Sequence, residues 1–235
     1  MAISLVVGGS SGIGLATAKQ LIALGDTVHI AGRSVERLTA ASAQLPPVTT
    51  HRVDAADAGR VAELGAEIGP VDRLVITVAG SGGVGPLVDL DLAGLRAAFE
   101  QKYWPTVTTI QALLPHLVPA GSITLVGAIT GRAAMPGTAG IGSLNAAVEG
   151  LVAPLAAELA PVRVNAVSPG YVDTPWWDAV PVDQRTAIFE EAATELPVRR
   201  VATADDIAQA IVLLATNPNI TGEILQTDGG AHLAA

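Results

Sequence analysis

The chain has 235 residues, of which 50% are hydrophobic but only 3% aromatic, so a sizeable core is possible and must be built from aliphatic side chains. The formal net charge of −9 argues against nucleic acid as a partner, because phosphate contacts need a basic surface. The absence of cysteine excludes disulfides and thiolate metal sites, and the four histidines are scattered at no metal-ligand spacing, so we expect no metal site.

Short apolar runs alternate with segments of helical periodicity along the whole chain. We expect strands at residues 3–7, 27–31, 48–53, 73–78, 122–126, 162–167 and 223–226. We expect helices at residues 13–24, 35–45, 58–68, 92–117, 138–159, 183–193 and 204–215. This alternation predicts an α/β fold in which residues 1–235 form a single domain, with a doubly wound, mostly parallel seven-stranded sheet and helices on both faces.

The segments between these elements contain no evident linker, repeat or low-complexity stretch. The chain opens directly into its first strand without a basic leader, and no segment approaches the ~20 uninterrupted apolar residues of a membrane span. We therefore expect a cytoplasmic protein that does not bind a membrane.

A glycine-rich turn, Gly8-Gly9-Ser10-Ser11-Gly12-Ile13-Gly14, lies directly between the first strand and the first helix. Glycines allow a tight turn there and let backbone N–H groups approach a pyrophosphate, to which the helix N-terminus adds partial positive charge. A merely flexible turn is the alternative. The strand before it and the helix after it favour dinucleotide binding on a Rossmann fold.

The spacing GxxxGxG of this turn resembles that of the short-chain dehydrogenase/reductase (SDR) family, and the resemblance covers nearly the whole chain. Further matches to the family follow in order: Asp54-Ala55, Ala79-Gly80, Asn165, Ser168-Pro169-Gly170, Thr174, Thr221-Gly222 and Asp228-Gly229-Gly230. The cofactor-binding residues that the resemblance implies are Gly8, Ser10, Ser11, Gly12, Ile13, Gly14, Asp54, Ala55, Ala79, Gly80, Asn145, Pro169, Gly170, Val172 and Thr174.

The end of the second strand indicates which dinucleotide is bound. An NAD site usually has a carboxylate there, which accepts from the ribose 2′-hydroxyl. This chain has Ala31-Gly32-Arg33-Ser34 and no acid. A guanidinium pairs with a 2′-phosphate, which a carboxylate would repel, and Ser10 or Ser34 is a further donor to that phosphate. We therefore predict NADP(H) as the cofactor. The alternative is that Arg33 is only a solvated surface charge.

The resemblance breaks at the catalytic positions, where the family has Asn, Ser, Tyr and Lys. In the family's register the Ser position is Ala128, the Tyr position Ile141, the Lys position Asn145 and the Asn position Lys102. Ala and Ile cannot exchange protons. Lys102 and Asn145 look like an exchange that keeps one cation and one amide in the site, and Lys102 is one of only two lysines beside eleven arginines.

We therefore expect Asn145 to bind the nicotinamide ribose and Lys102 to act at the reacting centre, either by stabilising negative charge or by donating a proton. Donation near neutral pH needs burial to lower the pKa of Lys102. Tyr171, at the carboxyl end of a strand, is a second catalytic candidate, with loop packing as its alternative. Thr130 and Ser143 are expected to be structural. The adjacent Trp176-Trp177 suggests a lid or an apolar pocket wall, or equally a subunit interface.

Two functions remain open. The first is an atypical NADP(H)-dependent oxidoreductase that transfers hydride between nicotinamide and a small carbonyl-, imine- or enone-type substrate. The second is an inactive SDR-like NADP(H)-binding sensor or scaffold. The resemblance also suggests a homodimer or homotetramer through helices 92–117 and 138–159, to which the apolar tail 231–235 is a possible contributor.

Overall fold

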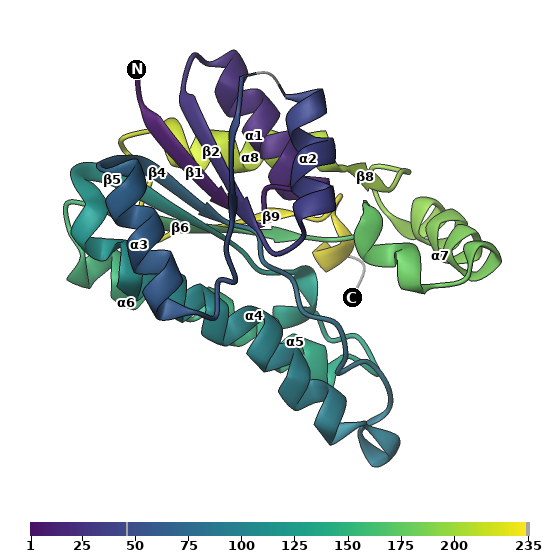
Figure 1. Cartoon of the computed structure of the whole chain (residues 1–235). Coiled ribbons are helices and arrows are strands. Elements are labelled where there is room, and N and C mark those ends of the chain that lie inside the picture. The colour runs from purple at the N-terminus through teal and green to yellow at the C-terminus, as the bar shows by residue number, and fades with distance from the viewer. Residues whose placement is uncertain (46, 234–235) are drawn as a thin grey trace.

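Parallel strands form the centre of the molecule in the computed structural model, which describes residues 1–45 and 47–233 (Figure 1). The strands of the main sheet are β1 (Ile3–Val7), β2 (Thr27–Gly32), β3 (Thr49–Arg52), β4 (Val71–Ile76), β5 (Leu117–Val126), β6 (Arg163–Pro169) and β9 (Ile224–Thr227). Their order is β3-β2-β1-β4-β5-β6-β9, and each neighbouring pair is parallel. The order changes direction between β1 and β4, where open α/β sheets bind ligands. The expected doubly wound, seven-stranded Rossmann fold is confirmed.

Helices cover both faces of the sheet, because successive strand residues point to opposite sides. One face buries Val6 beneath α1 (Gly12–Ala23), α2 (Val35–Gln44) and α8 (Ala204–Thr216). The other face buries Leu5 and Val7. It is covered by α3 (Ala58–Ile68), α4 (Leu92–Leu113), α5 (Ala139–Glu149) and α6 (Val152–Glu158). The fully buried large side chains are Leu and Ile, which matches the aromatic-poor composition.

The segment after β6 leaves the sheet and returns to it. It contains β7 (Val172–Asp173), the short 3-10 helix η4 (Pro175–Ala179), α7 (Val182–Glu195) and β8 (Ala202–Thr203). β7 and β8 pair in parallel as a separate two-stranded sheet, so they anchor both ends of the excursion. Sequence periodicity did not indicate these two-residue strands. In Figure 1 the excursion projects from the domain beside the C-terminal region.

The prediction of one continuous helix over residues 138–159 is wrong. α5 ends at Glu149 and α6 begins at Val152. Pro154 explains the break, because proline has no N–H to donate to the carbonyl of Gly150 and its ring crowds that carbonyl. The predicted strand 122–126 is also too short, since β5 already begins at Leu117. Part of the predicted tail contact, residues 234–235, lies outside the described residues.

The segment Ala139–Glu158 is, by length and composition alone, apolar enough to cross a membrane. In the structure it contributes Val148 and Val152 to the core beneath the sheet. It also carries two buried polar side chains, Asn145 and Glu149, which face the protein interior. α5 and α6 therefore pack against the sheet within the domain.

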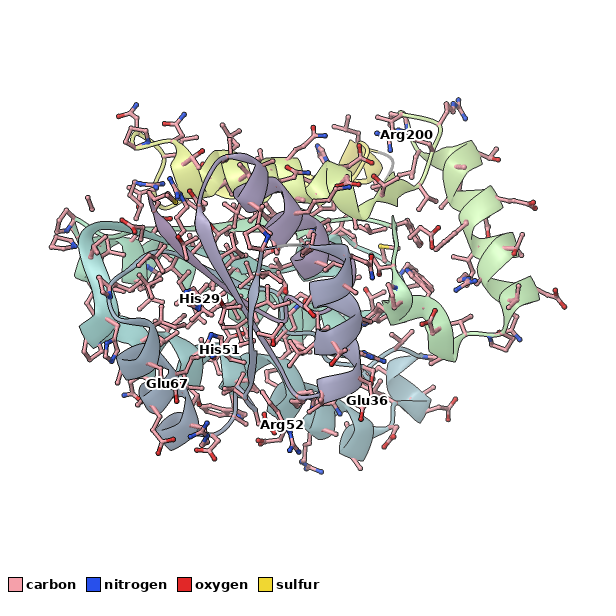
Figure 2. The ribbon with its side chains drawn as sticks, turned by 45° about the horizontal axis from the view of Figure 1, so that its top comes forward. His29, Glu36, His51, Arg52, Glu67 and Arg200 are labelled. Atoms are coloured by element: carbon pink, nitrogen blue, oxygen red, sulfur yellow. The ribbon has the colours of Figure 1, made fainter. Side chains whose placement is uncertain are left out.

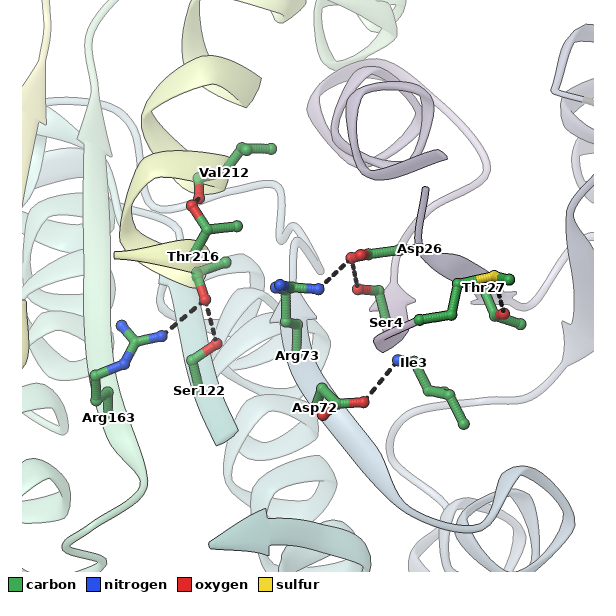
Figure 3. Close-up of polar contacts among 12 residues, drawn as sticks. Ile3, Ser4, Asp26, Thr27, Asp72, Arg73, Ser122, Arg163, Val212 and Thr216 are labelled. Atoms are coloured by element: carbon green, nitrogen blue, oxygen red, sulfur yellow. Dashed lines mark hydrogen bonds and ion pairs between the residues drawn. The ribbon is translucent and has the colours of Figure 1, made fainter. Parts of the chain in front are cut away.

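Polar side chains close the amino ends of the central strands (Figure 3). Asp26 accepts a hydrogen bond from Ser4 Oγ at 2.6 Å and forms an ion pair with Arg73. Asp72 accepts from the backbone N–H of Ile3 at 2.7 Å. These contacts join β1, β2 and β4 at one end, so the open end of the sheet is the opposite, carboxyl one.

Candidate active site

A cleft of about 950 Å³ runs across the carboxyl ends of β1, β4, β5 and β6. α4 and α5 form one of its walls, and η4 also contributes to its lining. Every residue singled out from the sequence as cofactor-binding or catalytic lines this cleft. These residues are Gly8, Ser10, Ser11, Gly12, Ile13, Gly14, Arg33, Ser34, Asp54, Ala55, Ala79, Gly80, Lys102, Asn145, Pro169, Gly170, Tyr171, Val172 and Thr174.

The glycine turn at the floor of the cleft depends on missing side chains. Gly8 and Gly12 have φ values of +91° and +52°, which favour glycine. A Cβ on Gly14 would lie only 2.3 Å from the backbone oxygen of Gly8. The side chain of Ser11 makes no capping hydrogen bond at the start of the 12-residue α1. The first N–H groups of this helix therefore face a cradle that suits a pyrophosphate.

At the far end of the cleft, the side chains of Arg33 and Arg37 are exposed at its edge. Ser10 lies close to the backbone there, with its Oγ 3.3 Å from the position of a Cβ on Gly32. Ser34 caps α2 by accepting from Arg37 N at 3.1 Å, and its hydroxyl donates to Glu36 Oε2 at 2.8 Å. Ser10 is thus the freer of the two predicted phosphate donors.

Glu36 itself stands outside the cleft lining. Figure 2 shows its exposed side chain on α2, with Arg52 labelled nearby at the end of β3. Its hydrogen bonds with its own backbone N–H and with Ser34 lower the pKa of the Glu36 carboxyl, as does the charge of Arg52. Glu36 is thus an anion at neutral pH, but it lies outside the lining, to which this region contributes the positive charges of Arg33 and Arg37.

The other half of the cleft contains Lys102 and Asn145, the pair that the sequence suggests as an exchange. Lys102 is buried, with 8% of its surface exposed, and reaches from α4 toward α5. Its Nζ donates to Asn145 Oδ1 at 2.7 Å and to the backbone oxygen of Gly127 at 3.3 Å. The two residues recognised as an exchange in the sequence are therefore direct partners.

The amide of Asn145 is held in one orientation by three partners. Its Nδ2 donates to Thr130 Oγ1 at 2.9 Å and to the backbone oxygen of Ile141 at 3.1 Å. Its Oδ1 must face Lys102, because an ammonium only donates. Thr130 therefore acts as a support for Asn145, in agreement with its expected structural role. Ser143 bonds back to Gly140 O at 2.7 Å within its own helix.

Burial lowers the pKa of Lys102 from 10.5 to about 8, because a desolvated ammonium is unfavourable. The carboxylate of Glu149 opposes this effect. A lowered pKa of Lys102 is what proton donation near neutral pH requires. Ala128 and Ile141 line the same region without any hydroxyl group.

Tyr171 lies in the cleft but belongs to an aromatic cluster beside α7. Its ring stacks on Trp177 with centroids 6.2 Å apart, and Trp177 meets Phe189 edge-on at 5.3 Å. Burial raises the pKa of Tyr171, and the charges of Glu195 and Glu191 raise it further. These partners orient Tyr171 toward α7 and make its hydroxyl a weaker acid than an ordinary tyrosine.

Trp176 lines the cleft from η4. Its indole Nε1 donates to the backbone oxygen of Gly80 at 3.2 Å, across 96 positions of sequence. Trp176 and Trp177 meet edge-on with centroids 4.9 Å apart. Both indoles line the cleft, while the choice between a lid, an apolar wall and a subunit interface stays a prediction.

Two charged residues at or behind the cleft were not anticipated. Arg37 lies one turn into α2, where its spacing of four from Arg33 was a usable signal. Glu149 is a buried acid four residues after Asn145, and its position inside an apolar helix was the available sign. A solitary acid on an otherwise apolar helix usually has a buried partner.

The fold and the cleft define a dinucleotide-binding Rossmann protein whose phosphate cradle is intact. Residues 7–232 match a family model described as enoyl-(acyl carrier protein) reductase. The chain is 33% identical over 243 residues to a Streptomyces violaceoruber protein named for ketoacyl reductase 2 of the granaticin polyketide synthase. The match covers 98% of this chain and 96% of the relative. The chain is also 32% identical to the cis-4-hydroxycyclohexanecarboxylate dehydrogenase of Sinomonas cyclohexanicum, in a match that covers 97% of this chain and 95% of that relative.

Among solved structures, a small-chain dehydrogenase in complex with NADPH superposes with a TM-score of 0.87 at 34% identity, covering 99% of both chains. A short-chain dehydrogenase/reductase family protein superposes with a TM-score of 0.86 at 33% identity, covering 99% of this chain and 97% of the other. The chain belongs to the short-chain dehydrogenase/reductase family, an oxidoreductase family.

Proposed function

We propose that this chain is an atypical NADP(H)-dependent oxidoreductase that transfers hydride between nicotinamide and a small carbonyl-, imine- or enone-type substrate. The observation that carries the proposal is the 2.7 Å contact between Lys102 Nζ and Asn145 Oδ1 inside the cleft. Random loss of catalytic residues gives no reason for a lysine and an amide to be exchanged between two helices and still meet.

The cofactor half of the cleft suits NADP(H) on structural grounds. The Gly8–Gly14 turn and the N-terminus of α1 receive the pyrophosphate, and Arg33 with Ser10 receives the 2′-phosphate. Arg37 adds a second positive charge at the same edge. The NADPH complex of a 34% identical dehydrogenase supports this assignment.

Asn145 can still accept a hydrogen bond from the nicotinamide ribose. Its two amide N–H groups and one lone pair of Oδ1 are already engaged, but a carbonyl oxygen has two lone pairs. The second lone pair accepts from a ribose hydroxyl. The bound nicotinamide supplies or accepts the hydride.

Lys102 serves the reacting oxygen or nitrogen of the substrate. As an ammonium it has three donors, of which two are used by Asn145 and Gly127, so the third is available toward the cleft. The lowered pKa of about 8 lets it give up that proton near neutral pH. Tyr171 remains a second candidate donor, and its raised pKa makes it the weaker one.

The substrate class follows from the side chains around this centre. Met135, Leu144 and Trp176 give the cleft an apolar wall, so a ligand with an apolar body is favoured. With no hydroxyl at Ala128 or Ile141 to polarise a plain ketone, a substrate that is already activated is favoured. Conjugated ketones meet both conditions and leave an oxygen for Lys102 to protonate, whereas an iminium ion already carries a positive charge and takes no proton from Lys102.

The second candidate function is an NADP(H)-binding sensor or scaffold without catalysis. The observation that favours it is the same absence of a proton-exchanging group at Ala128 and Ile141, beside an intact cofactor cradle. The sensor differs from the enzyme in one measurable respect. It binds NADP(H), but Lys102 catalyses no hydride transfer in it.

The decisive experiment incubates the protein with NADPH and panels of carbonyls, enones, imines and quinones, and follows loss of the reduced nicotinamide absorbance. The enzyme is supported if turnover on any panel member is abolished by Lys102→Ala while NADPH affinity is kept. Tight NADPH binding with no turnover on any panel supports the sensor, and turnover that survives Lys102→Ala removes the role given to Lys102.

We also propose that the chain assembles as a homodimer or homotetramer through α4 and α5. Trp104 on α4 supports this, because 51% of its surface is exposed in the single chain and a large exposed indole suits a contact surface. Light scattering on the protein and its Trp104→Glu variant tests the assembly, and a monomeric parent protein would contradict it.

A further inference from the structure

A buried carboxylate lies behind the catalytic half of the cleft without taking part in the steps described above. Glu149 on α5 has 4% of its surface exposed and follows Asn145 by one helical turn. A carboxylate is costly to bury unless charges or hydrogen bonds compensate it. Its surroundings therefore indicate what it does.

One oxygen of Glu149 is paired and the other is not. Oε2 accepts from Arg132 Nε at 2.7 Å, which holds the carboxylate as one half of an ion pair. Oε1 is buried and has no hydrogen-bond partner among the described residues. The ion pair with Arg132 thus anchors the side chain and leaves one oxygen directed at a neighbour.

That neighbour is Gly127, which separates Glu149 from Lys102. A Cβ on Gly127 would lie 2.4 Å from Glu149 Oε1, so the carboxylate fits there only because this residue is glycine. On its other side, the carbonyl of Gly127 accepts from Lys102 Nζ at 3.3 Å. A single backbone residue therefore separates the buried anion from the buried cation.

We propose that Glu149 is a positioning residue: anchored by Arg132 and admitted by Gly127, it is the counter-charge of Lys102 and sets the pH range over which that ammonium gives up its proton. The assignment of an acid role to Lys102 rests on the proposed function. The electrostatic coupling itself does not.

The charges around Lys102 make Glu149 the relevant partner. Burial drives the pKa of Lys102 downward, and Glu149 is the charge that opposes this effect. Arg132, from the segment after β5, acts on the site through its ion pair with Glu149. Residues 77–80, which line the cleft after β4, carry no charge, and Glu100 on α4 itself is exposed to solvent.

The test uses the fact that the chain has only two lysines, Lys19 and Lys102. Selective ¹³C labelling of lysine gives two Cε signals, whose pH titration requires neither substrate nor turnover. Lys102→Met assigns the buried signal, and exposed Lys19 serves as an internal reference. We expect the Lys102 signal of the parent protein to titrate near pH 8.

Glu149→Gln keeps the shape of the side chain and removes its charge. We expect it to lower the titration midpoint of Lys102 by about one pH unit, because a nearby opposite charge favours the charged form of a group. The Lys19 signal should stay in place. Glu149→Asp restores the charge and should recover part of the lost midpoint of Lys102. If Glu149 had a purely structural role, the Asp and Gln variants would have the same Lys102 midpoint. Glu158→Gln, an exposed acid on α6, is the matched control.

An unchanged midpoint in a folded Glu149→Gln protein overturns the proposal, as does an upward shift. If that variant does not fold, Gly127→Ala provides the same information, since its Cβ displaces the carboxylate without removing it. A lowered Lys102 midpoint in Gly127→Ala supports the proposal, and an unchanged one refutes it. Because the measurement is made without substrate, its failure is distinct from failure of the proposed oxidoreductase activity.

Discussion

The two halves of the cleft differ in the part of the chain that shapes them, which is backbone in one half and side chains in the other. The cofactor half is built from backbone, since Gly8, Gly12 and Gly14 work through positive φ values and absent side chains. The half that we propose to be catalytic is built from side chains, where Lys102 and Asn145, by the family's register, stand in each other's expected places. A site made of backbone admits almost no substitution. A site made of side chains can be rebuilt, provided that the required atoms still meet.

The largest expected effect tests the rebuilt half. Lys102→Met keeps the length of the side chain and removes its proton, so we expect the kcat of the best panel substrate to fall by about 10²- to 10⁴-fold, the range for loss of a general acid. Affinity for NADPH, measured by calorimetry, should change little. Lys19→Met is the control, and equal losses in both variants would show that the effect is not specific to the site.

Gly14→Ala tests the backbone half. Its Cβ would lie 2.3 Å from the oxygen of Gly8, so the turn must open. Such overpacking costs about 1–3 kcal/mol, which corresponds to a roughly 10- to 100-fold loss of NADPH affinity if the strain falls on the bound state. Gly59→Ala, at an exposed helical position of α3, should leave affinity unchanged. Normal binding by Gly14→Ala would mean that the cofactor lies elsewhere.

The pH dependence of reduction sharpens the role of Lys102. Because the folded-state pKa is about 8, the donating ammonium is present below that pH and is lost above it. The kcat/KM for reduction should therefore fall about tenfold per unit as the pH rises beyond 8. A stopped-flow or steady-state pH profile measures this effect. A profile that is flat between pH 7 and about 10, the ordinary range of a lysine pKa, would exclude Lys102 as the donor.

Arg33→Ala tests the charge preference of the cofactor half. We expect a loss of roughly tenfold in NADPH affinity and little change for NADH, since an exposed charged hydrogen bond contributes about 1.5 kcal/mol. Arg96→Ala, an exposed arginine on α4, is the matched control. An equal loss for both dinucleotides would instead place Arg33 at a phosphate that they share.

The smallest expected effect concerns a region remote from both halves. His29 Nδ1 and His51 Nε2 lie 2.9 Å apart on β2 and β3, with Glu67 beside them (Figure 2). Burial lowers the pKa of both rings from 6.5. The unfolded chain therefore takes up protons first as the pH falls, so stability should decrease below about pH 6.5. Thermal unfolding across pH measures this decrease, and His51→Gln should make the dependence shallower.

Much of the fold could be predicted from the sequence, because short apolar runs and helical periodicity are local signals. The helix break at Gly150 was missed although Pro154 was visible, because the apolar pattern continues through it. The two-residue strands β7 and β8 are too short to show a periodicity, and they are defined by their pairing with each other. At the candidate site, Lys102 and Asn145 were singled out by register against the family, and the structure places them in contact. Glu149 was not, since its importance depends on Gly127, which is 22 positions away and adjacent only in three dimensions.

The hydrogen bond between the Trp176 indole and the carbonyl of Gly80 has a practical consequence. The contact ties η4 to the loop after β4, so any movement of η4 away from that loop has to break it. Two of the three tryptophans of the chain, Trp176 and Trp177, lie at this point. Their intrinsic fluorescence is therefore a built-in signal of such a movement, which can be read without attaching a label.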